Sequence, residues 1–211
     1  FFFWRRKTFL NYFYIMNYLF HLVLSGDNPD IIIGNYIADH IRGTKIVNEL
    51  PNPVLKGVLL HRAIDAYSDM HPAVRHSVAL LKPSHARYAS VAVDILYDHF
   101  LIKNWKQFVK TPMIKKINSF YALLSDRIDT LPPKSQKVTR KLLQDNWFGL
   151  YETFDGLNDV FIGVTKRTHF ENALPETVEY LVKYYDKLDT DFKVFAHDIF
   201  SFVSLHTRYR L

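Results

Sequence analysis

Apolar residues recur at three- and four-residue steps along most of the chain, the spacing that places side chains on one face of an α-helix. A first helix is expected after Met16, and it ends in the turn-forming cluster at residues 25–29. Asp30 is expected to cap a second helix over residues 31–41, because Asp is a favoured N-cap residue. Gly43 lies where such a helix would end.

The rest of the chain continues the helical spacing, and prolines together with Gly149 separate the segments. The expected helical segments are 54–70, 71–82, 88–104, 113–131, 135–147, 150–164 and 176–203. Only 7 Gly and 9 Pro interrupt the chain, and no stretch of convincing length alternates with the period of a strand. The sequence therefore predicts a compact, single-domain, all-α bundle of about seven to nine helices.

The composition excludes several classes of protein. Apolar residues make up 48% and charged residues 23% of the chain, which excludes a disordered protein. The chain has no cysteine, so a disulfide framework, a thiol nucleophile and a cysteine-bound zinc ion are excluded as well. No run approaches the roughly 18–20 apolar residues of a membrane span. We expect a cytoplasmic protein that does not associate with a membrane.

The first fifteen residues differ from the rest. They read FFFWRRKTFLNYFYI, with aromatic residues on both sides of a basic group, and precede the first methionine, Met16. The apolar block comes before the basic residues and no small-residue cleavage site follows, an order that does not fit a signal peptide. We interpret residues 1–15 as a non-native or disordered leader, and residues 16–211 as the domain.

Polar residues that can bind metals lie inside otherwise apolar helical segments. Three pairs of them are spaced four residues apart, namely Asn35 and Asp39, His61 and Asp65, and Asp94 and Asp98. Four residues turn a helix by about 400°, so both members of a pair project from one face. A single such pair is typical of a surface ion pair. Several pairs together with His21 suggest a divalent cation, because buried charges need partners and no sulfur ligand is available.

Four sequence blocks carry a family resemblance. They are Met16–His21, Gly34–Asp39 followed by Arg42-Gly43, His61–Asp65, and Asp94–Leu101 followed by Trp105. In order and spacing, from Met16 to about Val203, the chain resembles the acyl carrier protein phosphodiesterases, a divergent branch of the HD-type metal-dependent phosphohydrolases. The resemblance implies an HD-domain-like all-α fold. It also implies hydrolysis of the phosphodiester that joins 4′-phosphopantetheine to a serine of holo-acyl carrier protein, which leaves the apo protein.

The resemblance also implies a metal cofactor, Mn²⁺, with Mg²⁺ or another divalent cation as substitutes. The residues that we expect to supply the ligands are His21, Asp39, His61, Asp65 and Asp98. Asp69 and His99 are candidates for proton transfer to the leaving serine oxygen or for orienting ligands. Arg62 and Arg42 are expected to bind the phosphate, because the guanidinium group matches its geometry. Asn35 is expected to contact the substrate or a metal ligand.

An adjacent His-Asp pair, the usual signature of HD enzymes, occurs as His197-Asp198 in the last helical segment. This pair lies outside the four blocks. In their place the blocks contain His61 and Asp65 four residues apart, and the reversed dipeptide Asp98-His99. We interpret His197-Asp198 as part of a solvent-facing turn of the last helix.

The charge balance suggests a partner. The chain has 27 Lys and Arg against 21 Asp and Glu, a formal net charge of +6. Acyl carrier protein, the substrate that the resemblance implies, is small and strongly acidic, so basic residues near the site would steer the encounter. Basic residues near the four blocks are Arg42, Lys45, Lys56, Arg62, Arg75, Arg87, Lys103 and Lys106.

Two other functions fit parts of this pattern. One is an HD-type phosphohydrolase that acts on a nucleotide or another small phosphate ester with the same ligands. The other is a basic helical module that binds nucleic acid. The basic residues are scattered and form no recognised groove-reading motif, so we expect no nucleic-acid partner.

Overall fold

The structure is a computed structural model that describes residues 18–41, 49–166, 168 and 170–205. These residues form helices and no strand, which confirms the all-α prediction. Nine α-helices of seven residues or more occur within these ranges, in agreement with the expected number. None of the described helices is long and apolar enough to cross a membrane. The proposed leader lies outside the described residues, and the HD-like assignment stays a prediction.

The described residues form a series of helices. In chain order they are α1 (Tyr18–Leu24), α2 (Pro29–Ile37), η1 (Ala38–His40), α4 (Asn52–Met70), α5 (Pro72–His85), η2 (Ala86–Tyr88), α6 (Ala89–Lys103), α7 (Trp105–Phe108), α8 (Met113–Arg127), η3 (Ile128–Thr130), α9 (Pro133–Gln144), α10 (Trp147–Leu150), α11 (Phe154–Thr165), η4 (Leu174–Glu176) and α12 (Thr177–Leu205), where η marks a 3₁₀-helix.

The start of α2 corrects one expectation. Asn28, and not Asp30, is the N-cap, because its side-chain oxygen accepts hydrogen bonds from the backbone N–H groups of Asp30 and Ile31 at 3.0 and 3.2 Å. The expectation that Asp30 caps this helix was wrong by two residues. Pro29 takes the first helical position, where its missing N–H costs nothing, so Asp30 falls in the first turn instead. The α-helix ends at Ile37 and continues as η1.

Two helices form the centre of the core. All seven residues of α1 are buried, and α6 has buried residues on all sides. A helix that is buried all round must satisfy its polar groups internally. The carboxylate of Asp98 on α6 does so by accepting hydrogen bonds from the backbone N–H groups of Phe20 and Leu19, at 2.9 and 3.2 Å. Asp98 therefore holds the first turn of α1 against α6.

Helices α2 and α4 touch backbone to backbone. A Cβ atom on Gly34 would lie 2.0 Å from the carbonyl oxygen of Val54, and one on Gly57 would lie 2.2 Å from that of Ile31. Only glycine permits such an approach. Asn35 is the next residue after Gly34, and His61 lies one helical turn after Gly57. The close crossing therefore brings the amide of Asn35 beside the ring of His61.

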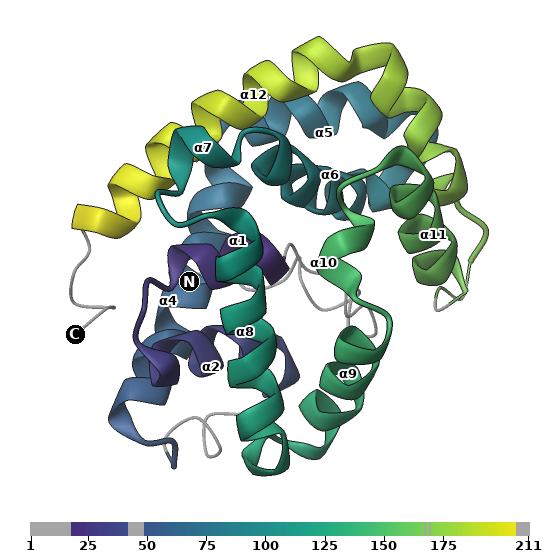
Figure 1. Cartoon of the computed structure of the whole chain (residues 1–211). Coiled ribbons are helices and arrows are strands. Elements are labelled where there is room, and N and C mark those ends of the chain that lie inside the picture. The colour runs from purple at the N-terminus through teal and green to yellow at the C-terminus, as the bar shows by residue number, and fades with distance from the viewer. Residues whose placement is uncertain (1–17, 42–48, 167, 169, 206–211) are drawn as a thin grey trace, which may run out of the picture.

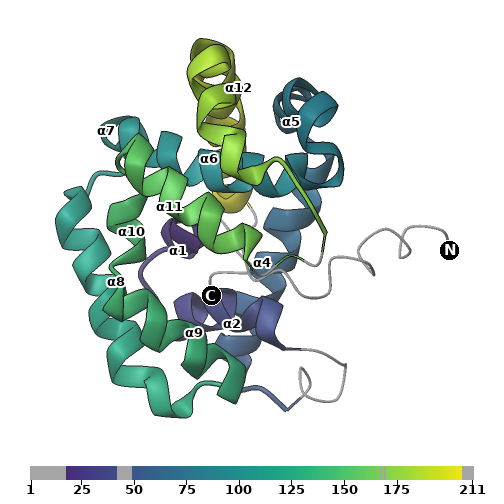
Figure 2. The same cartoon turned by 90° about the vertical axis from the view of Figure 1, so that its right-hand side faces the viewer.

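The outer helices surround this centre. Figure 1 shows α12 across the top of the molecule beside α5, with α8 and α9 at the opposite end, near α2. Figure 2, turned by 90°, shows α9 in front of α2, and the hydrogen bond between the hydroxyls of Tyr36 and Thr139 links the two helices. The long helix α12 bends at Tyr184, where the backbone leaves helical geometry (φ −116°, ψ 17°). The molecule therefore has two ends, one built on α5 and α12 and the other on α2, α8 and α9.

Candidate metal centre

Three side chains from α1 and α4 form a group that can hold a metal ion. Ligand atoms of His21, His61 and Asp65 all lie within 4.8 Å of one another. The Nε2 atoms of the two histidines each lie 3.5 Å from a different oxygen of Asp65. Asp39, on η1, places an oxygen 3.3 Å from Nε2 of His61. The structure therefore brings together four of the five residues that we expected to supply ligands.

The group is buried on one side and open on the other. The two imidazole rings are buried and pack against each other at an interplanar angle of 32°, with 4.3 Å between their centroids. The side chain of Asp39 is 39% exposed and that of Asp65 is 29% exposed. A ligand from solvent could therefore reach the carboxylates, while the imidazoles remain shielded from water.

Asn35 makes four hydrogen bonds beneath this group. Its side-chain nitrogen donates to the backbone carbonyl of His21 at 3.1 Å and to Oγ of Ser25 at 2.8 Å. Its side-chain oxygen lies 2.9 Å from Nδ1 of His21 and 2.9 Å from Nδ1 of His61. A backbone carbonyl only accepts hydrogen bonds, so the amide nitrogen must face it and the amide oxygen must face the two rings.

This orientation fixes the tautomer of both histidines. The Asn35 oxygen only accepts, so Nδ1 of His21 and Nδ1 of His61 must both carry a proton and donate. In a neutral ring the proton on Nδ1 leaves Nε2 with a free electron pair. Both Nε2 atoms then present lone pairs towards carboxylate oxygens, which are acceptors too. A proton or a metal cation must lie between such groups to make the contact favourable.

The electrostatics at His21 favour a neutral ring. Burial lowers the pKa of His21 below its ordinary value, and the neighbouring His61 lowers it further, against the opposing effect of Asp65. Burial would raise the pKa of Asp39, but when His61 is protonated, its Nε2–H hydrogen bond and its charge hold that pKa below its ordinary value. A neutral imidazole and an ionised carboxylate are the forms in which these residues bind metals.

The fifth expected ligand has other partners. Both oxygens of Asp98 accept backbone N–H groups of α1, and burial raises its pKa well above the ordinary value despite these bonds. His99, the next residue, donates from Nδ1 to the carbonyl of Tyr151 at 2.8 Å, and its ring packs against Phe154 and Tyr185. Neither residue belongs to the group of His21, His61 and Asp65.

The remaining residues that we expected at the site do not belong to this group among the described residues. Arg62 and Asp69 are exposed on α4, the helix that carries two residues of the cluster. Arg42 lies outside the described residues. His197 is exposed in α12, as expected, and its neighbour Asp198 hydrogen bonds with Nε2 of His71 at 3.2 Å.

The sequence did not predict a role in the site for three residues that build it. Ser25 anchors the amide of Asn35, and Gly34 and Gly57 permit the helix crossing that brings Asn35 to His61. The glycines did leave a signal. Each interrupts a helical pattern, where glycine costs about 1 kcal/mol relative to alanine and so calls for a packing reason.

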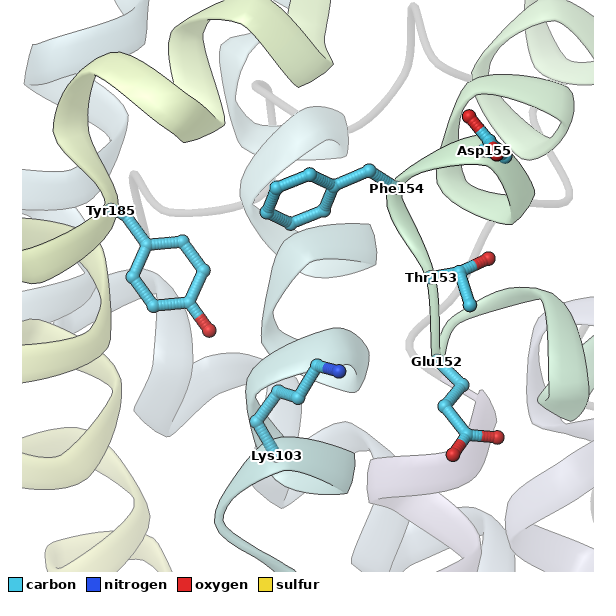
Figure 3. Close-up of a pocket in the computed structure, with 6 residues that line it drawn as sticks. All are labelled: Lys103, Glu152, Thr153, Phe154, Asp155 and Tyr185. Carbon is cyan, nitrogen blue, oxygen red and sulfur yellow. The ribbon is translucent and has the colours of Figure 1, made fainter.

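A cavity lies elsewhere on the molecule, between the end of α6, the start of α11 and α12. It has a volume of about 400 Å³ and is lined by Lys103, Glu152, Thr153, Phe154, Asp155 and Tyr185 (Figure 3). Its walls mix two aromatic rings with charges of both signs. It contains no residue of the metal-competent cluster, so we treat it as separate from the candidate centre.

Comparison with known proteins gives a consistent result. The family model described as acyl carrier protein phosphodiesterase matches residues 16–199. The chain is 28% identical to the acyl carrier protein phosphodiesterase of Enterobacter sp. (strain 638), over 84% of this chain and 92% of that protein. It is 29% identical to the proteins of the same name from Salmonella agona (strain SL483) and Photorhabdus laumondii subsp. laumondii, again over 84% of this chain and over 92% and 89% of those proteins.

No solved structure matches the chain. The family model covers the segments that contribute His21, Asn35, Asp39, His61 and Asp65. Because the match extends over most of the sequence, the chain belongs to the acyl carrier protein phosphodiesterase family.

Proposed function

We propose that this protein is a metal-dependent phosphodiesterase that removes 4′-phosphopantetheine from a serine of holo-acyl carrier protein and leaves the apo protein. The family and the names of the relatives support the reaction class and the substrate. Metal dependence is supported by one observation above all, the two Nε2 lone pairs that Asn35 directs towards the carboxylates of Asp39 and Asp65.

The donor set fits Mn²⁺, with Mg²⁺ or another divalent cation as a substitute. It offers two imidazole nitrogens and carboxylate oxygens and no sulfur, a combination that suits manganese, iron and zinc as well as harder cations. His21, His61 and Asp65 would hold the ion, with Asp39 beside them. When bound, such an ion lowers the pKa of water and offsets negative charge on a phosphodiester.

The residues of the chain then have separate tasks. Water adds to phosphorus, the bond from phosphorus to the serine oxygen breaks, and that oxygen must receive a proton. Asp69 remains our candidate for supplying the proton, and Arg62 for binding the phosphate. His99 is fully buried, bonds to the carbonyl of Tyr151 and lies outside the cluster, so we no longer assign it this task. Asn35 is fully buried and uses its amide for four hydrogen bonds, so we assign it to orienting the histidines and not to contacting the substrate.

The decisive experiment compares two aspartate variants by mass spectrometry. Wild-type protein with Mn²⁺ should convert holo-acyl carrier protein to the apo form, and Asp65→Ala should lose both this conversion and Mn²⁺ binding. Asp198→Ala, which alters the His-Asp dipeptide outside the centre, is the matched control and should retain both. Full conversion by Asp65→Ala would overturn the assignment of the site. Hydrolysis of a nucleotide by wild-type protein that leaves holo-acyl carrier protein intact would establish the alternative activity.

A further inference from the structure

Helix α9 carries a strongly basic surface. Its twelve residues, Pro133–Gln144, include no acidic residue and four basic ones, Lys134, Lys137, Arg140 and Lys141. All four side chains are exposed. We call these four residues the α9 basic face. These residues were not among the basic residues that the sequence predicted to steer the substrate, because α9 is distant from the four sequence blocks along the chain.

The fold attaches this helix to the segment that supplies the metal-competent cluster. Ser135 and Thr139 are buried on the inner side of α9. The Ser135 hydroxyl lies 2.7 Å from Nδ1 of His40, and the Thr139 hydroxyl lies 2.9 Å from the hydroxyl of Tyr36. His40 and Tyr36 directly follow Asp39 and Asn35 in the sequence. In Figure 2 α9 lies in front of α2, the helix to which the hydrogen bond between Thr139 and Tyr36 connects it.

Nearby acidic residues do not cancel the basic face. Arg140 reaches Asp129 at 3.8 Å and Lys141 reaches Asp145 at 3.4 Å. Asp129 is 91% exposed and both basic partners are 57% exposed, so water and salt screen these pairs strongly. With these two partners included, the α9 basic face carries four positive charges against two negative ones.

The cluster itself creates a need for such a surface. Its two carboxylates, Asp39 and Asp65, form the solvent-exposed side of the centre and would balance the charge of one divalent cation, so the centre has little net charge to attract an acidic macromolecule. A cationic surface on the helix that is bonded to Tyr36 and His40 can supply this attraction and orient the approaching partner, because complementary charge accelerates and directs encounter.

We propose that the α9 basic face is the docking surface for the acidic carrier protein substrate. This inference rests on the proposed function. It extends the proposed function by assigning to α9 the binding of the protein portion of the substrate, while the phosphodiester lies at the cluster. Hydrogen bonds from Ser135 and Thr139 to the segment 36–40 fix the position of this surface relative to the centre.

A pair of charge-reversal variants tests this proposal. Lys137→Glu with Lys141→Glu reverses two charges of the α9 basic face, four residues apart. Lys183→Glu with Lys187→Glu is the matched control, because these lysines have the same spacing and are exposed on α12, at the other end of the molecule. Both variants should keep the circular dichroism spectrum and Mn²⁺ affinity of the wild type.

The expected result is a split between KM and kcat. For holo-acyl carrier protein, the α9 variant should raise KM about tenfold at low salt while kcat stays near the wild-type value, because charge acts mainly on encounter. The difference should shrink as salt increases. The α12 variant should leave KM within about twofold. An unchanged KM in the α9 variant, or equal increases in both variants, would overturn the docking proposal.

Binding of apo-acyl carrier protein, measured by fluorescence anisotropy, separates this proposal from the proposed function. Apo protein lacks the phosphodiester, so its binding does not require turnover. Loss of apo binding in the α9 variant would support docking even if the wild type failed to hydrolyse the holo protein. Absence of binding by the wild type would overturn it. Duplex DNA binding that is lost in the α9 variant, with carrier binding unaffected, would assign the surface to nucleic acid and also overturn it.

Discussion

Replacing Asn35 with alanine should test how the candidate centre is organised. The substitution removes the acceptor that both Nδ1–H groups share, and it removes the donor to the His21 carbonyl and to Ser25. Without this acceptor the rings of His21 and His61 can rotate or move their protons to Nε2. The tautomer that presents two lone pairs to the cluster is then no longer enforced.

The size of the effect follows from the hydrogen bonds that are lost. Each buried polar group left without a partner costs about 1–3 kcal/mol. Two Nδ1–H donors lose their acceptor, so we expect the free energy of unfolding to fall by about 2–6 kcal/mol in the absence of metal. Residues that orient metal ligands typically change metal affinity by about 10–100-fold when mutated, and we expect the Kd for Mn²⁺ to rise by that factor.

The assay combines metal titration with NMR spectroscopy. Electron paramagnetic resonance of free Mn²⁺ gives the Kd, and side-chain ¹⁵N shifts report which nitrogen of each histidine carries the proton. Asn35→Asp keeps the shared acceptor and should preserve the Nδ1–H tautomers. Asn104→Ala is the control, since it removes another buried amide with bonds to Phe100 and Asp189 on α6 and α12. A folded Asn35→Ala variant with unchanged Mn²⁺ affinity would refute the reasoning.

Three further predictions concern the fold around the site. Gly57→Ala should destabilise the protein by about 1–3 kcal/mol or more in urea unfolding, because its Cβ would lie 2.2 Å from a carbonyl oxygen. Gly163→Ala is the control, since its Cβ would meet open space, and it should be neutral or stabilising. Equal effects of the two substitutions would contradict the close helix crossing. Burial lowers the pKa of His40 to about 4, so about 3 kcal/mol of stability should be lost as pH falls from 6.5 to 4, and His40→Gln should remove this loss; an unchanged pH profile would count against it. Burial raises the pKa of Asp98, so the wild type should lose stability as pH rises above the ordinary pKa of an aspartate, and Asp98→Asn, which cannot ionise, should not show this loss; the same pH dependence in both proteins would oppose this.

Local pattern accounts for much of the agreement between expectation and structure. The spacing of apolar residues identified the helices, and the i and i+4 pairs identified residues that do share a helix face, such as His61 and Asp65. The same rule could not separate Asp94 and Asp98 from the other pairs. Both oxygens of Asp98 accept backbone N–H groups from α1, which is about eighty residues away along the chain, and no local spacing records such a contact.

The sequence by itself determined the helical fold, the family and most of the residues of the cluster, because helical periodicity and residue chemistry are local properties. Only the tertiary structure decided how these residues act together. The contact of Gly34 and Gly57 sets the distance between two helices, and that distance lets a single amide at Asn35 fix the tautomers of His21 and His61. Likewise, α9 lies beside the centre through side-chain hydrogen bonds that span about one hundred residues of sequence. Such contacts depend on packing in three dimensions, which the order of residues along the chain does not display.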